Sequence, residues 1–419
     1  MSCTGSDIFQ QALPLSEVSS TTTTARKQLD AFGLERASTK IVVFEYTGKY
    51  DSGPLLFETV VSGTGSSTFV ALSGANTLST GGTASGASCI RQSHVYIIYV
   101  PGKARQAIIG MNCGAVVTNA SKRVGMFDTN EGIYFEQKTA GISFIVRSKI
   151  TGSIVEQEFL QSAWTLDKLD GTGSSGYTLD ATKPQALVIE WVGYNIGYIR
   201  LGFFIAGVVV YVTEISQLNN ISSFSIGSST LPVRYEVTNT GIASGIATLN
   251  TSSCIVYDED GQENQFSYTF NANMGITAKA VTTILPLISI RPKASFNGIV
   301  NRSRVKMADI TTLVKTNDAL IEIWRGGTLT GAAWSSVDSN SVTEFDIAAT
   351  ILTGGIKIDS FYQSAASGST TTTRTEQVDS KIALFNDYAG TSPDILTITA
   401  RSITATSNVL TSLQFLEQR

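Results

Sequence analysis

The chain has 419 residues, enough for two or three domains with a substantial core. Its hydrophobic fraction of 42% argues against disorder over most of its length, while its charged fraction is only 15%. The net charge of −4 excludes an extended basic surface, so we expect no nucleic-acid partner.

No targeting or membrane segment is expected. The first residues, M-S-C-T-G-S-D, lack the basic and apolar parts of a secretion signal. The longest apolar run, residues 201–212, is too short to span a bilayer and contains Gly202 and Gly207. We therefore expect a product made in a cytoplasm, without membrane insertion.

Residues 1–38 contain little core material and include a Ser/Thr-rich run at 19–24. We interpret them as an extended arm that anchors on a neighbouring surface through Leu29, Phe32 and Leu34. The alternative is a frayed terminus.

Residues 39–240 are predicted to form the main domain, a large β-sandwich. Its runs are rich in β-branched and aromatic residues and are separated by Gly, Pro, Ser and Asn. The expected strands are 41–46, 68–72, 95–100, 106–111, 132–136, 142–150, 186–192, 198–205 and 208–215. A short helix is possible only near 153–162, because no long stretch has helical periodicity.

The stretch 180–237 organises this domain. In the run 198–205, Ile199, Leu201, Phe203 and Ile205 alternate with Tyr198, Arg200, Gly202 and Phe204, so one face is wholly apolar. We expect a strand in the middle of a sheet, with a second layer over its apolar side. The following Ala206-Gly207 is a two-residue hairpin signal.

The remaining chain is also predicted to be β. Residues 241–275 are interpreted as a β-hairpin connector that turns at Asp258-Glu-Asp-Gly261. Residues 276–419 are interpreted as a second, smaller β-sandwich. Its expected strands are 284–290, 298–307, 319–324, 345–351, 357–362, 381–385 and 394–400.

The sequence offers no convincing metal site, cofactor site or catalytic centre. Four cysteines have neither zinc-site nor redox-pair spacing, and we expect buried free thiols at Cys3, Cys89, Cys113 and Cys254.

The single histidine, His94, lacks a G-x-S-x-G elbow and is expected to be structural. Glu190 beside Trp191 mildly suggests a glycosidase carboxylate, but no partner acid can be nominated, so a salt-bridge role is favoured. Asp167, Asp170 and Asp180 flank the loop G-T-G-S-S-G and are expected to cap turns rather than hold Ca²⁺.

Aromatic residues are the better binding candidates. Trp164, Tyr194 and Tyr198 could form an exposed platform beside Asp170 on which sugar rings stack. The alternative, favoured for most of the aromatics, is that they belong to the core.

Several blocks give the chain, from about residue 30 onward, a resemblance to a family of tailed-phage virion structural proteins. D-A-F-G-L-E-R-A-S at 30–38 is similar to the arm motif D-A-F-G-R-L-R-V-S of that family. The other blocks are K-Y-D-S-G-P-L-L-F-E at 49–58, Y-V-P-G-K at 99–103, R-V-G-M-F-D-T-N-E-G-I-Y-F-E at 123–136, W-T-L-D-K-L-D-G-T-G-S-S-G-Y-T-L-D at 164–180, L-P-V-R-Y-E-V-T-N-T at 231–240, W-S-S-V-D-S-N-S at 334–341 and A-G-T-S-P-D-I-L-T at 389–397.

This resemblance implies a non-enzymatic virion component: a fibre, collar, baseplate or capsid-decoration protein. It also implies assembly with other virion proteins and with itself, commonly as a homotrimer. The expected fold is all-β: an N-terminal arm, a large jelly-roll or laminin-G-like sandwich, and a smaller β-sandwich. Since such a sandwich also suits carbohydrate, a protein that binds a host surface glycan is the alternative hypothesis.

Overall fold

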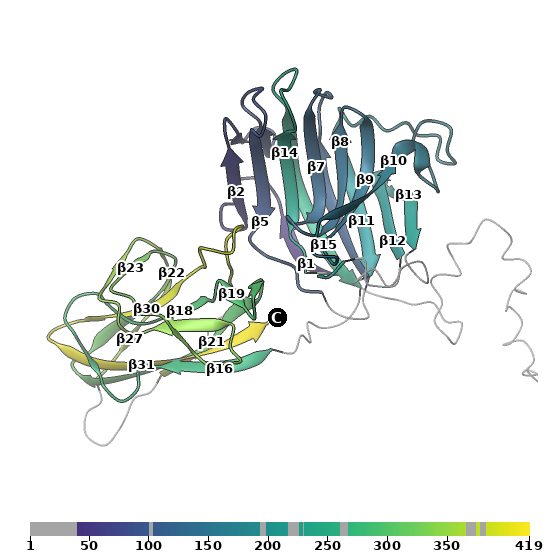
Figure 1. Cartoon of the computed structure of the whole chain (residues 1–419). Helices are drawn as coiled ribbons and strands as arrows, with labels where there is room; N and C mark the ends of the chain where they lie inside the picture. The colour runs from purple at the N-terminus through teal and green to yellow at the C-terminus, as the bar shows by residue number, and fades with distance from the viewer. Residues whose placement is uncertain are drawn as a thin grey trace, which may run out of the picture.

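In the described part of the chain, the regular secondary structure is almost entirely antiparallel β-strand, as expected from the sequence (Figure 1). The computed structural model describes residues 40–99, 104–192, 198–216, 226–228, 230–259, 267–365, 374–377 and 383–419. The predicted anchors Leu29, Phe32 and Leu34 lie outside these residues. The described strands form two β-sandwiches, each with its own hydrophobic core.

The first sandwich has two large sheets, which we call the back sheet and the front sheet after their positions in Figure 1. In sheet order, the back sheet comprises β13 (Val208–Ser216), β12 (Tyr198–Ile205), β11 (Gln185–Val192), β6 (Ala104–Asn112), β15 (Thr248–Glu259), β4 (Ala75–Ser79) and β3 (Ser66–Val70), with β1 (Lys40–Tyr46) paired to β15. The front sheet comprises β10 (Val155–Leu160), β9 (Gly141–Ser148), β8 (Gly132–Lys138), β7 (Ala120–Phe127), β14 (Val233–Asn239), β5 (Ser88–Ser93) and β2 (Phe57–Ser62).

Aromatic side chains join the two sheets. Phe203 of the back sheet meets Phe135 of the front sheet edge to face, with ring centroids 5.7 Å apart. Trp164 and Phe144 pack beside them. Burying such rings supplies much of the stabilisation of a sandwich core.

The second sandwich pairs two six-stranded sheets. One comprises β16 (Tyr268–Asn273), β31 (Ser407–Gln418), β21 (Arg304–Thr316) and β28 (Arg374–Gln377), with β17 (Lys279–Val281) and β29 (Ala383–Leu384) at its sides. The other comprises β24 (Ser335–Ser336), β25 (Thr343–Asp346), β18 (Leu285–Pro292), β30 (Leu396–Ser402), β22 (Ala319–Arg325) and β27 (Ile356–Gln363). Two small ribbons complete it: β19 (Ser295–Phe296) with β20 (Ile299–Val300), and β23 (Thr328–Thr330) with β26 (Ile351–Thr353).

The alternation predicted for residues 198–205 is confirmed. Ile199, Leu201 and Phe203 are fully buried, whereas Tyr198 and Phe204 are nearly half exposed. The β12–β13 hairpin turns at residues 206–207, both of which have positive φ as a type I′ turn requires. The strand is not central, however: β12 lies next to the edge strand β13, because the sheet grows through β11 and β6 on its other side.

The predicted hairpin at 241–275 is wrong. Strand β15 pairs with β1, β4 and β6 in the first sandwich, while β16 pairs with β31 in the second. Asp258 is therefore not in a turn but in β15, where it pairs with the buried Arg105 at 2.6 Å. Pairing partners far along the chain decided this, and a local turn signal does not report them.

Two further expectations were wrong. Residues 95–99 form only an isolated bridge, Ile97 with Leu231, rather than a strand. The possible helix near 153–162 is instead strand β10 followed by one 3₁₀ turn, Gln161–Ala163. Among the described residues, no helix has the length and apolar character needed to cross a membrane.

Candidate functional site

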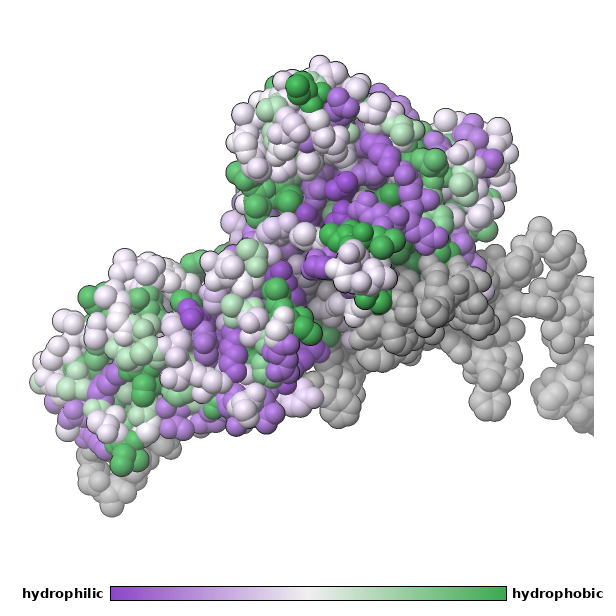
Figure 2. Space-filling view, in the orientation of Figure 1, coloured by the Kyte–Doolittle hydropathy of each residue, from purple (hydrophilic) through white to green (hydrophobic). Residues whose placement is uncertain are grey.

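The outer face of the front sheet carries a cluster of charged side chains, which we call the charged face. In β14, Val233, Tyr235 and Val237 point into the core, so Arg234 and Glu236 point outward. Hydrophilic residues gather over this part of the first sandwich in Figure 2. The alternation of charged and apolar residues within the strand is what creates the charged face.

The strand register brings oppositely charged residues together. Glu236 lies opposite Arg123 of β7, which in turn lies opposite Glu136 of β8. Arg123 bonds both carboxylates, with Nε 2.7 Å from Glu136 and Nη1 3.0 Å from Glu236. Such cross-strand pairs of opposite charge stabilise a sheet.

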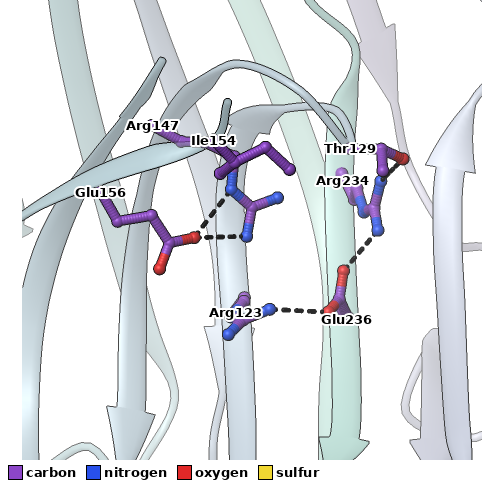
Figure 3. Close-up of a pocket in the computed structure, with 7 residues that line it drawn as sticks. All are labelled: Arg123, Thr129, Arg147, Ile154, Glu156, Arg234 and Glu236. Carbon is purple, nitrogen blue, oxygen red and sulfur yellow. Dashed lines mark hydrogen bonds and ion pairs between the residues drawn. The ribbon is translucent and has the colours of Figure 1, made fainter. Parts of the chain in front are cut away.

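Two more arginines complete the cluster (Figure 3). Arg234 binds the second oxygen of Glu236. On β9, Arg147 donates to Glu156 of β10 at 2.8 Å through Nε, and it also donates to the hydroxyl of Tyr134 at 3.1 Å. Charge-assisted bonds of this kind are stronger than neutral hydrogen bonds, so these side chains hold one another in fixed positions.

A hollow of about 460 Å³ lies within the charged face. Its lining residues are Arg123, Thr129, Arg147, Ile154, Glu156, Arg234 and Glu236 (Figure 3). In β7, Gly125 sits between Arg234 and Tyr134 in the register, and a Cβ there would lie 2.6 Å from the Cα of Tyr134. Glycine thus permits the close approach of β7 to β8 beneath the cluster.

The carboxylates of the hollow are held in their charged form. Burial alone would raise the pKa of Glu236, but the guanidinium groups of Arg234 and Arg123 beside it hold that pKa below its usual value. The pKa of Glu156 is also lowered, because the bonds from Tyr134 and Arg147 outweigh burial. Neither group is therefore suited to donate a proton near neutral pH.

The aromatic platform considered from the sequence does not include Trp164. Trp164 is buried in the core, where its indole contacts Phe144 and Phe203, so the core alternative holds for this residue and its candidacy for glycan binding is wrong. Tyr198 is exposed, but it lies on the outer face of β12, opposite the core face that Trp164 contacts through Phe203. Tyr194 lies outside the described residues.

The three aspartates around the glycine loop cap turns, as predicted. Asp167 accepts bonds from the backbone of Leu169 and Ser175. Asp170 accepts bonds from the backbone N–H and the hydroxyl of Thr172. Asp180 accepts the same two bonds from Thr182. These bonds hold the turns around the glycine loop.

His94 and Glu190 also have the structural surroundings expected for them. A ring nitrogen of His94 lies 3.3 Å from the backbone oxygen of Pro54. Glu190 accepts a bond from the hydroxyl of Tyr211 and lies 3.8 Å from Arg200.

The described cysteines are buried free thiols, as predicted: Cys89, Cys113 and Cys254. Burial raises the pKa to about 11 for Cys89 and to about 12 for the other two. Cys3 lies outside the described residues. Across the described ranges, no three His, Cys, Asp or Glu side chains gather as metal ligands do.

The charged face was not predicted from the sequence, although blocks quoted for the resemblance contain its residues. The block at 123–136 supplies Arg123 and Glu136, and the block at 231–240 supplies Arg234 and Glu236. A usable signal was present in the second block, which places Arg234 and Glu236 two apart within an apolar strand pattern. Which charges meet depends on the register, and that is decided far along the chain.

No family model and no curated protein matches the chain. Solved structures resemble it at low identity. A glycosyl hydrolase family protein from Mycobacterium fortuitum is 11% identical over 52% of this chain and 99% of that one, with a TM-score of 0.34. The corresponding values are 11%, 53%, 100% and 0.30 for a legume lectin-like domain from Entamoeba histolytica, and 10%, 52%, 98% and 0.32 for a β-glucanase from Bacillus licheniformis. Several neighbours are thus named as glycoside hydrolases, but similarity at this level carries no conclusion about activity.

Proposed function

We propose that this chain is a non-enzymatic structural component of a tailed-phage particle that assembles with itself, as a trimer, and with other virion proteins. It would be made in the host cytoplasm and reside on the exterior of the virion. The sequence blocks quoted above support this proposal, as does an architecture of two β-sandwiches linked in series.

The observation that carries the non-enzymatic part is the neutralisation of the charged face. Hydrolysis of a glycosidic bond needs two facing carboxyl groups, one of which keeps its proton near neutral pH. The hollow is lined by Glu156 and Glu236, and arginines lower the pKa of each. The carboxylates therefore serve to fasten strands together.

The virion assignment can be tested on particles. Mass spectrometry of purified particles of a phage that encodes the chain should detect its peptides at a stoichiometry similar to that of other structural proteins. Their absence from particles that are intact and infectious would contradict the proposal.

The oligomeric state can be tested in solution. Sedimentation equilibrium should give about three times the mass of one chain, which is 44.6 kDa for the full chain, and a chain without residues 1–38 should likewise give about three times its own smaller mass. A trimer lost on truncation would place assembly in the arm, and a full-length monomer would contradict assembly through the sandwiches.

The absence of activity can be tested with β-glucan. We expect no release of reducing ends above that of a heat-denatured sample. Release that is abolished by Glu156→Gln or Glu236→Gln would overturn the non-enzymatic proposal.

A second candidate function, glycan binding, is favoured by one feature of the hollow. The Nε atom of Arg234 is buried and has no hydrogen-bond partner among the described residues, and a buried donor calls for a ligand or a water. Sugar hydroxyls can both donate and accept, which suits a lining of arginines and glutamates.

Blocking the hollow tests this candidate without breaking an ion pair. Ile154 lines the hollow and is half exposed, so Ile154→Trp should abolish binding of any glycan detected on an array. Ile150→Trp, at a partly exposed residue that does not line the hollow, is the matched control and should bind normally. Equal binding by both variants would exclude the hollow as the glycan site.

A further inference from the structure

One end of the charged face is in contact with the second sandwich. The contact is made by residues 387–392, which we call the docking loop. Figure 1 shows a loop of the second sandwich reaching the ends of β2 and β5. The hydroxyl of Tyr388 in this loop lies 3.0 Å from the hydroxyl of Thr129, and the guanidinium of Arg234 lies 5.2 Å from the centre of the Tyr388 ring.

A second cation shapes the docking loop from its own side. Arg302 donates to the backbone oxygens of Asp387 and Tyr388 at 2.7 and 2.8 Å. The same guanidinium stacks on the ring of Tyr96 in the first sandwich, 4.3 Å from its centre. Arg302 therefore both fixes the loop and contacts the opposite sandwich, which favours a specific interface over an incidental touch.

The loop also has an internal framework that holds its shape. The Asp387 carboxylate accepts bonds from the backbone of Thr391 and Ser392 at 2.6 and 2.9 Å. Gly390 has a φ of +71°, a conformation that other residues rarely adopt. A loop preorganised in this way loses little conformational entropy on docking.

Glu58 of β2 is a titratable group at this interface, and His94, which interacts with Asp394 and Arg325 of the second sandwich, is another. The Glu58 carboxylate accepts a hydrogen bond from the backbone N–H of Tyr388. The charged groups that face it are Asp387, Asp394 and Arg302, all from the second sandwich. Glu58 is thus an acid of the first sandwich whose surroundings are supplied by the second.

We infer that the docking loop and Arg302 form a lock on the surface made by Glu58, Tyr96, Thr129 and Arg234, and that this lock holds the two sandwiches in one orientation. The partner that this surface fits is the second sandwich of the same chain. Because Thr129 and Arg234 also line the hollow, the lock and the hollow share one wall.

The direction of the pH effect follows from the surroundings of Glu58. Burial, with additional repulsion from Asp387 and Asp394, raises the pKa of Glu58 from its usual 4.5 to about 7. At Glu58 the locked form therefore binds a proton that the unlocked form has released in this range, so the contribution of Glu58 to locking is largest below about pH 4.5 and is lost as the pH rises through about 7. His94, whose pKa is lowered by burial, contributes with the opposite sign below its usual value of 6.5. The shift at Glu58 corresponds to at most roughly a 300-fold change in the locking equilibrium.

The test measures the distance between the two sandwiches in the full chain. The described native cysteines are buried, so spin labels can be directed to new cysteines at two highly exposed positions, Leu72→Cys and Ile276→Cys, in a Cys3→Ser background. Pulsed electron spin resonance should give one narrow distance distribution at pH 5 that broadens between pH 5 and 8. Glu58→Gln should keep the distribution narrow at pH 8.

Substitutions in the lock provide the decisive comparison. Tyr388→Ala should broaden the distribution at pH 5, whereas Tyr362→Ala, at an exposed tyrosine of the same sandwich away from the interface, should leave it unchanged. Thr129→Ala, which removes the hydroxyl that contacts Tyr388 and Arg234 but leaves the Tyr388 ring in place, should broaden it less and covers the case in which Tyr388→Ala fails to fold. A distribution that is broad in the parent at pH 5, or unchanged in both lock variants, would overturn the inference.

Discussion

Both outer faces of the first sandwich carry Arg–Glu ion pairs, but the pairs are buried to different extents. On the front sheet, Arg234 and Glu236 form a pair whose side chains are only 3% and 8% exposed. On the back sheet, Arg200 and Glu214 form a pair that is 24% and 20% exposed. Water still solvates the second pair, so its loss costs little, whereas each member of the first depends on its partner for solvation.

This difference shows how the fold converts ordinary strand pairing into a rigid surface. On the charged face, adjoining pairs share partners, since Arg123 binds both Glu136 and Glu236. On the back sheet, Arg200 bonds Glu214 at 2.8 Å and approaches Glu190 only at 3.8 Å. A connected, buried network should respond to a single substitution far more strongly than a half-exposed one.

The largest expected loss of stability is caused by Glu236→Ala. This change leaves Arg123 and Arg234 without a carboxylate that they share, and breaking a buried pair in this way costs about 3–5 kcal/mol. Denaturant-dependent hydrogen exchange in peptides from β7 and β14 reports the first sandwich alone and measures this loss. The matched change on the back sheet, Glu214→Ala, should cost at most about 1 kcal/mol. Equal losses would contradict the distinction between the two faces.

A smaller change in stability is expected when the pH is lowered. Because the pKa of Glu236 is depressed in the folded protein, its stabilising contribution is present above about pH 4.5, its ordinary value, and is lost as the pH falls below that value. The difference in stability between the parent and Glu236→Gln should therefore shrink between pH 5 and pH 3, as followed by the same exchange measurement. A difference that is constant over this range would mean that Glu236 is not charged in the native protein.

The smallest expected effect is on the reactivity of the buried thiols. Their rate of labelling reports whether the interior of the front sheet or of the back sheet opens. Cys89 belongs to the front sheet and Cys254 to the back sheet, and both are buried with a raised pKa. Neither should react with a thiol reagent at pH 8 within hours, because reaction requires an exposed thiolate. Peptide mapping after labelling separates the two sites. Rapid labelling of Cys89 alone would show that the front sheet opens despite its ion pairs.

The sequence by itself determined the local features of this protein. The alternation in β12, the turn at 206–207 and the aspartate caps were all predicted, because each depends on residues close together in the chain. The free cysteines followed from their number and spacing and from the size of the core.

Only the tertiary structure decided which strands and side chains contact one another. β15 and β16 look like two arms of a hairpin, yet each completes a different sandwich. Arg123 bonds Glu236, which is more than a hundred residues away in the sequence, and the buried indole of Trp164 packs beside Phe203. Strand register and core packing are global choices in which burial of apolar area outweighs local signals, so the charged face and the lock became visible only in the folded chain.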